Sequence, residues 1–158
     1  MSWGSAYLET RVLSAEPVDL IAISYEFATL RVHEARSALA KRDIAERCKA
    51  ISKTIAILAE LESSLDYKLG GEIAYNLGRL YRYMRGLLTQ ANLWQKDEPL
   101  AEVQQLLETL AEAWRAIGTG SRNANTADAS PVDEVPKEWG ALAFMDSGAG
   151  HGAHGWNA

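Results

Sequence analysis

The sequence predicts an all-α fold, an antiparallel up-down four-helix bundle. Four segments carry apolar residues at alternating spacings of three and four, which places those residues on one face of a helix. Short stretches of turn-forming residues separate the segments, and short connections make consecutive helices antiparallel neighbours. The chain has 158 residues, 47% of them hydrophobic, which is enough for one domain with its own core.

The first predicted helix begins at Pro17 and ends near residue 41. Proline lacks a backbone N–H, and the first helical turn does not need one. Two apolar stripes lie side by side on this helix, the first made of Leu20, Ile23, Phe27 and Leu30, and the second of Ile21, Tyr25, Ala28, Val32, Ala35 and Leu39. So wide an apolar face predicts packing partners on two sides. Residues 1–16 show no such stripe and are predicted to be an N-terminal arm.

The second predicted helix begins at Asp43, which stands three residues before Glu46 as in a capping box. Its stripe keeps the heptad spacing for four heptads and consists of Ile44, Cys48, Ile51, Ile55, Leu58, Glu62 and Leu65. Cys48, the single cysteine, falls on this stripe. We therefore expect an inert core thiol at this position, not a nucleophile.

Gly70 and Gly71 are predicted to close the second helix, since glycine adopts a positive φ without a steric penalty. The third helix follows, with a stripe of Ile73, Leu77, Leu80, Met84, Leu87 and Ala91, widened by Ala74, Tyr81 and Leu88. Pro99 marks the first turn of the fourth helix, whose stripe is Leu100, Val103, Leu107, Leu110, Trp114 and Ile117. Gly118 and Gly120 are predicted to end it. The bundle is thus expected to span residues 17–118.

Residues 119–158 are too polar and glycine-rich to repay the entropy of forming a core element, which predicts a flexible tail. One apolar cluster stands out in the segment 139–145, made of Trp139, Leu142, Phe144 and Met145. Either this cluster is a disordered apolar segment, or it docks on the bundle and competes for its binding surface.

Composition and motifs exclude several functional classes. The chain contains no run of about 18 apolar residues and begins without the basic and apolar regions of a signal peptide, so we expect a cytoplasmic protein that does not insert into membranes. No cofactor-binding loop is present. His33 has no glutamate three residues before it, as a di-iron bundle would require, and His151 and His154 alone are not a preorganised metal site. We therefore expect neither a cofactor, a metal nor an enzyme.

Arg79, Arg82 and Arg85 alternate with tyrosines on the third predicted helix and offer the best case for a nucleic-acid surface. A net charge of −5 argues against it, because nucleic-acid-binding domains are usually basic. Four tyrosines could instead lie at the edges of a groove that binds an amphipathic helix. They are Tyr25, Tyr75, Tyr81 and Tyr83. Core packing would also explain any one of them.

A set of residues in fixed order resembles the FliS family of flagellin export chaperones. The resemblance covers about residues 7–117, and its most specific part is Leu65-Asp66 followed by Gly70-Gly71-Glu72-Ile73-Ala74. The other matching residues are Tyr7, Val12, Leu13, Pro17, Leu20, Tyr25, Glu60, Leu61, Asn76, Leu77, Leu80, Tyr81, Tyr83, Met84, Leu88, Ala91, Asn92 and Trp114.

The resemblance implies a cytosolic four-helix bundle that is not an enzyme. It would bind the disordered C-terminal segment of flagellin, prevent premature polymerisation and aid delivery to the flagellar type III export gate. The expected client groove lies along the second and third helices and contains Ile51, Ile55, Leu58, Leu65, Ile73, Asn76, Leu77, Leu80, Tyr81 and Met84. Some of these must belong to the core instead. In the absence of client, the N-terminal arm would occupy the groove through Tyr7, Leu8, Val12 and Leu13. A nucleic-acid-binding protein that uses Arg79, Arg82 and Arg85 is the alternative.

Overall fold

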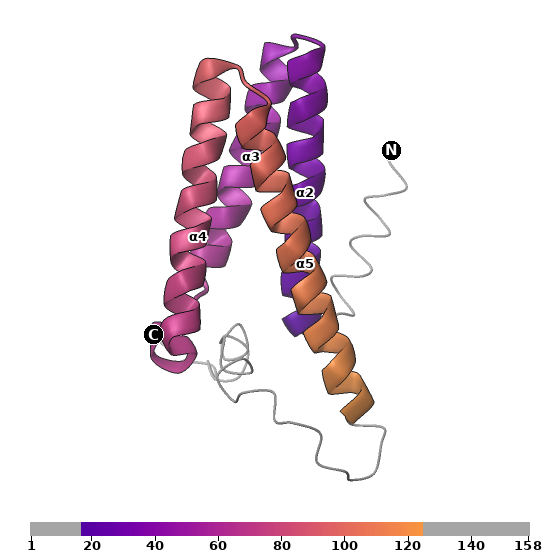
Figure 1. The fold of residues 1–158 in the computed structure, drawn as a ribbon, viewed down its shortest axis with the longest axis vertical. Helices are drawn as coiled ribbons and strands as arrows, with labels where there is room; N and C mark the ends of the chain where they lie inside the picture. Colours follow the sequence, from indigo (N-terminus) through magenta and orange to yellow (C-terminus); the bar gives the residue numbers. More distant parts are fainter. Residues whose placement is uncertain (1–16, 125–158) are drawn as a thin grey trace, which may run out of the picture.

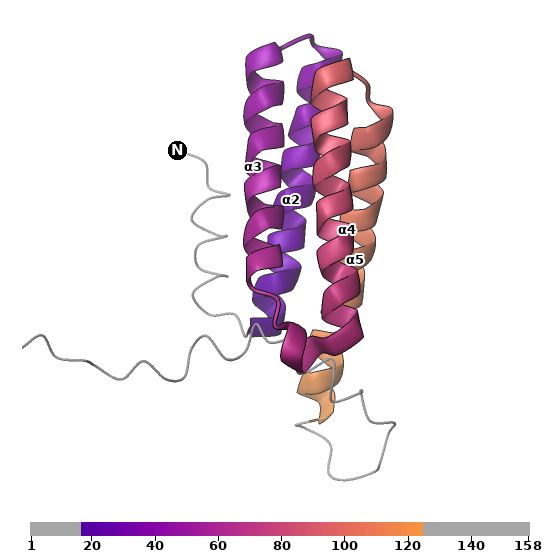
Figure 2. The same cartoon turned by 90° about the vertical axis from the view of Figure 1, so that its left-hand side faces the viewer.

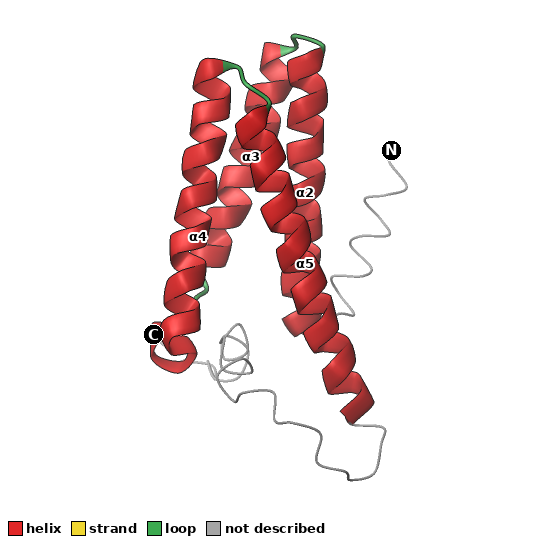
Figure 3. Ribbon diagram, in the orientation of Figure 1, coloured by secondary structure: helices red, strands yellow, loops and turns green. Residues whose placement is uncertain are grey.

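The described part of the structure, a computed structural model, consists of residues 17–124 and is helical apart from short connections (Figures 1 and 3). Its helices are α2 (Pro17–Ala40), α3 (Ile44–Ser63), α4 (Tyr67–Trp94) and α5 (Glu98–Ala124). The predicted arm, and the predicted tail from residue 125 onward, lie outside the described residues. None of the helices in residues 17–124 combines the length and apolar character needed to cross a bilayer.

Successive helices run in opposite directions, as predicted. The α2–α3 and α4–α5 connections lie at one end of the bundle, drawn at the top of Figure 1, and the α3–α4 connection lies at the other. We call the latter the lower end; it also holds the first turn of α2 and the last turn of α5 (Figures 1 and 2). Helix α2 packs against both α3 and α5, while α4 packs against the same two helices from the other side. Helix α2 therefore has packing partners on two sides, which confirms the prediction.

The core of the described residues lies between the four helices. Helix α2 contributes mainly small buried side chains, such as Ala28 and Ala35. Small residues allow neighbouring helices to approach closely, and larger side chains from all four helices fill the rest of the interior. The largest fully buried side chains are Tyr25, Tyr81, Leu58, Met84, Leu88, Leu100, Leu107, Val32, Val103 and Thr54.

Helix α3 is turned about its axis relative to the predicted stripe. Ile44, the first stripe residue, is 59% exposed, whereas Arg47 and Thr54 are buried. Arg47 Nε donates to Asn92 Oδ1 at 3.1 Å, and Thr54 Oγ1 donates to the carbonyl oxygen of Ala50 at 3.0 Å. These internal partners are what makes burial of two polar residues possible. The predicted start of α3 is confirmed, because Asp43 Oδ1 accepts from Glu46 N at 3.1 Å.

The prediction that Gly70 and Gly71 end the second helix is wrong. Helix α3 already ends at Ser63, and Asp66 caps the next helix by accepting from the backbone N–H groups of Lys68 and Leu69. One turn of α4 thus forms before the glycines, and Gly71 then kinks the helix with φ 50° and ψ −131°. Gly71 has the predicted positive φ, but it bends helix α4 at a position where the sequence predicted a helix end.

Replacing Gly71 by alanine is expected to lower the free energy of unfolding by about 1–2 kcal/mol, because a Cβ strains this backbone conformation. Urea denaturation measures the change. Gly86 is the matched control in the same helix: a Cβ there would meet nothing within 4 Å, so Gly86→Ala should stabilise the helix by about 0.5–1 kcal/mol. Equal effects of the two substitutions would contradict this account of the kink.

Helix α5 also extends further than predicted. Gly118 and Gly120 were expected to end it, yet it continues to Ala124. Glycine inside a helix costs about 1 kcal/mol relative to alanine, so a glycine need not end a helix. Gly118 is buried. The boundary between bundle and tail therefore lies at least six residues beyond the predicted one.

Candidate functional site

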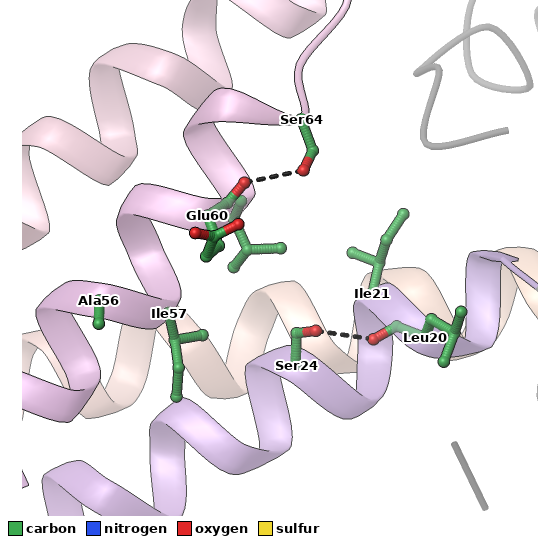
Figure 4. Close-up of a pocket in the computed structure, with 8 residues that line it drawn as sticks. Leu20, Ile21, Ser24, Ala56, Ile57, Glu60 and Ser64 are labelled. Atoms are coloured by element: carbon green, nitrogen blue, oxygen red, sulfur yellow. Dashed lines mark hydrogen bonds between the residues drawn. The ribbon is translucent and has the colours of Figure 1, made fainter. Parts of the chain in front are cut away.

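An apolar pocket of about 420 Å³ lies between α2 and α3, near the lower end of the bundle (Figure 4). Helix α2 lines it with side chains from its first turns, and α3 lines it with side chains from its last turns. We call it the α2–α3 pocket and define it by Leu20, Ile21, Ser24, Ala56, Ile57, Glu60, Leu61 and Ser64.

Small residues make the hollow, and their polar atoms are already satisfied. Ala56 and Ser24 leave space between the two helices, while Leu20 and Ile57 supply apolar surface (Figure 4). Ser24 Oγ donates to the carbonyl oxygen of Leu20 at 2.9 Å, and Ser64 Oγ donates to that of Glu60 at 2.8 Å. Because both hydroxyl protons are used within the helices, the pocket wall can face an apolar ligand at little cost.

Beside this pocket, the start of α4 exposes further large apolar side chains. Tyr67 follows Ser64 by three residues, and its ring packs edge-on against Tyr75, with centroids 6.2 Å apart at 72°. Tyr67, Leu69 and Tyr75 are all exposed. The Tyr67 hydroxyl lies over Gly78, where an added Cβ would be 2.8 Å from it. The lower end thus presents both a hollow and aromatic surface.

The pocket residues were missed by the heptad analysis. Ala56, Ile57 and Leu61 lie off the predicted stripe of α3, and the spacing alone did not mark them. A signal was present, because apolar residues outside a helical stripe indicate a second apolar face. Leu20 was assigned to a stripe of α2, and its place in a pocket depends on how α3 packs beside it.

Most of the predicted groove residues belong to the core. Six of the ten are buried: Ile51, Leu58, Leu65, Leu77, Tyr81 and Met84. All six belong to the core cluster, as the sequence predicted for some of the ten. Ile55, Ile73 and Leu80 are partly buried, and Asn76 is exposed. The arm residues Tyr7, Leu8, Val12 and Leu13 lie outside the described residues.

Two of the four tyrosines proposed for a groove edge are core residues. Tyr25 and Tyr81 are fully buried and share a hydrogen bond of 2.5 Å between their hydroxyl oxygens. Trp114 packs edge-on against Tyr25, with centroids 5.5 Å apart. Burial raises the pKa of Tyr25 far above its usual value and that of Tyr81 to about 12. Tyr75 and Tyr83, in contrast, are exposed.

The buried tyrosines predict a loss of stability in alkali. In the unfolded chain they ionise near pH 10, whereas in the fold they hold their protons to higher pH. Above pH 10 the unfolded state binds fewer protons, so the free energy of unfolding should fall by about 1.4 kcal/mol per pH unit for each tyrosine. Urea denaturation at pH 9–11.5 measures this slope. Tyr81→Phe should halve it, and an unchanged slope would contradict the prediction.

Two of the three arginines share one carboxylate of the adjacent helix α3. Arg82 Nε lies 3.3 Å from Glu62 Oε1, and Arg85 Nη1 lies 3.0 Å from Glu62 Oε2. Among the described residues, Arg79 is the one arginine of the three that has no carboxylate within ion-pair distance. Paired arginines are poorly placed to contact phosphates, which weakens the nucleic-acid alternative.

Cys48 is partly buried, and its Sγ lies 3.4 Å from Asn92 Oδ1. Among residues 17–124, no group of three or more histidine, cysteine or acidic side chains is placed to hold a metal ion.

Comparison with known proteins agrees with this geometry. The family model described as "Flagellar protein FliS" matches residues 3–121. The chain is 38% identical over 117 residues to the flagellar secretion chaperone FliS of Salmonella typhimurium, covering 73% of this chain and 87% of that protein. It is 36% identical over 110 residues to FliSB of Pseudomonas aeruginosa, covering 70% and 87%, and 34% identical over 113 residues to FliS of Campylobacter jejuni, covering 72% and 88%. The chain belongs to the FliS family of flagellar secretion chaperones.

Proposed function

We propose that this chain is a cytosolic export chaperone for flagellin. It binds the disordered C-terminal segment of newly made flagellin, prevents that segment from polymerising prematurely, and aids its delivery to the flagellar type III export gate. The protein carries out no chemical reaction in this role. What it supplies is apolar surface that covers the client until export.

The α2–α3 pocket is the observation that carries the proposal. An amphipathic helix docks by placing a few apolar side chains into such a groove, and Leu20 and Ile57 give the pocket the apolar lining that this requires. The pocket lies at the edge of the core, since Ile21 and Leu61 line it and also belong to the core cluster. A client can occupy it and leave again without unfolding the bundle.

The proposed contact surface extends from this pocket onto the half-buried part of the predicted groove. Ile55, Ile73 and Leu80 are partly accessible, and the exposed Asn76 can hydrogen-bond the client backbone. In the absence of client, the arm covers part of the surface through Tyr7, Leu8, Val12 and Leu13. A client that folds on binding gains wide coverage at moderate affinity, which suits cargo that must be released for export.

Isothermal titration of the full chain with a peptide of the last forty or so residues of the same organism's flagellin tests the proposal. We expect one-to-one binding, a negative heat-capacity change from buried apolar surface, and a gain of helical circular dichroism. Binding should depend only modestly on salt. No heat and no change in circular dichroism would overturn the proposed function, and affinity for nucleic acid that collapses with salt would favour the alternative.

A further inference from the structure

One rim residue of the α2–α3 pocket has an unused charge. Glu60 is exposed at the pocket edge, and only its backbone carbonyl is engaged, by Ser63 and Ser64. Among the described residues no side chain forms an ion pair or a hydrogen bond with its carboxylate. The pocket therefore combines an apolar lining with one free acceptor at its rim, and it suits an apolar segment that brings a donor.

Such a segment lies in the same chain beyond α5. Residues 125–158 contain a single lysine or arginine, Lys137. Two residues later comes Trp139, which begins the apolar cluster of segment 139–145. An ammonium group and an indole N–H are both donors without acceptor capacity, and both suit the Glu60 carboxylate.

The chain is long enough to bring this segment to the pocket. Helix α5 ends at Ala124, at the lower end where the pocket lies (Figures 1 and 2). The fifteen steps from Ala124 to Trp139 span up to about 50 Å when extended, while the longest helix, α4 with 28 residues, is about 42 Å long. The linker can therefore reach the pocket without any rearrangement of the bundle.

We propose that segment 137–145 of this chain docks in the α2–α3 pocket, with Trp139 and Phe144 against its apolar lining and Lys137 paired with Glu60. A tether of this length gives an effective concentration of the order of 1 mM. A dissociation constant near 100 μM for the untethered segment would then keep the pocket about 90% closed. If the proposed function holds, the tail acts as a built-in competitor and weakens client binding about tenfold.

Docking is tested without any client, by amide chemical shifts of the full-length chain. Trp139→Ser combined with Phe144→Ser should shift the amides of Ser24, Ala56 and Glu60. The matched control is Trp156→Ser, which removes a tail aromatic outside the segment and should leave these amides unchanged. Shifts confined to the neighbours of the substitutions overturn the proposal. The proposal is also overturned if the pocket amides shift when Leu8→Ser and Leu13→Ser are combined in the arm but do not shift with the tail substitutions.

A charge exchange tests the pairing. Lys137→Glu should move the pocket amides in the same direction as the Trp139/Phe144 variant, and adding Glu60→Lys should restore them. A double variant that fails to restore them overturns the assigned pairing. Titration with the flagellin peptide is a separate measurement: the Trp139/Phe144 variant should bind about tenfold more tightly. If neither the unaltered protein nor the Trp139/Phe144 variant binds the peptide, the proposed function is wrong. The amide shifts still decide whether the segment docks.

Discussion

Leu77→Ala lowers the free energy of unfolding by about 2–5 kcal/mol, the cost of a cavity in a packed core. Leu77 is 7% exposed and belongs to the core cluster that includes Leu58 and Tyr81. The sequence left open whether this leucine faces the core or a client. The structure decides for the core, so the substitution should act on stability, with client affinity preserved under conditions in which the variant is folded.

Leu93→Ala is the matched control for this experiment. Leu93 lies in the same helix but is 73% exposed, so its truncation should change stability by less than about 0.5 kcal/mol. Urea denaturation followed by circular dichroism measures both variants. If Leu77→Ala left the denaturation midpoint unchanged and abolished binding of the flagellin peptide, the assignment of Leu77 to the core would be wrong.

Ala56→Glu is expected to weaken binding of the flagellin peptide by at least thirtyfold, about 2 kcal/mol. Ala56 is exposed and lines the α2–α3 pocket. A glutamate there fills the hollow and places a carboxylate where an apolar client side chain would bind, and burying an unpaired charge is costly. The fold should tolerate the change, because an exposed glutamate is a good helix residue.

Ser52→Glu adds the same charge one turn earlier on the same exposed side of α3, outside the pocket. It should leave both affinity and stability nearly unchanged. Isothermal titration measures affinity, and urea denaturation confirms that both variants are folded. Unchanged affinity in both variants would place the client elsewhere on the bundle, whereas an equal loss of affinity in both would indicate a general charge effect.

The helices themselves could be predicted from local signals. The apolar period of each segment, the first-turn prolines Pro17 and Pro99 and the cap at Asp43 all act over a few residues, so the sequence alone marks them. The same signals located the buried faces of α4 and α5, including Leu88 and Trp114. Glycine was harder to interpret, because Gly71 and Gly118 permit a helix end without requiring one.

The binding surface could not be predicted in this way. The spacing of apolar residues shows which residues share a face of a helix, but the neighbouring helices decide how the helix is rotated and which face is buried. Consecutive residues differ by about 100° around the axis, so a small rotation changes which residues are buried. This is why Ile44 is exposed while Arg47 and Thr54 are buried.

The sequence by itself therefore determined the number, order and approximate limits of the described helices, and the resemblance that the family match confirmed. Only the tertiary structure decided which stripe residues are core and where a hollow lies. The α2–α3 pocket exists because Ser24 and Ala56, 32 positions apart in the sequence, leave space at the same level of two antiparallel helices. Such a juxtaposition arises from packing, which no local pattern records.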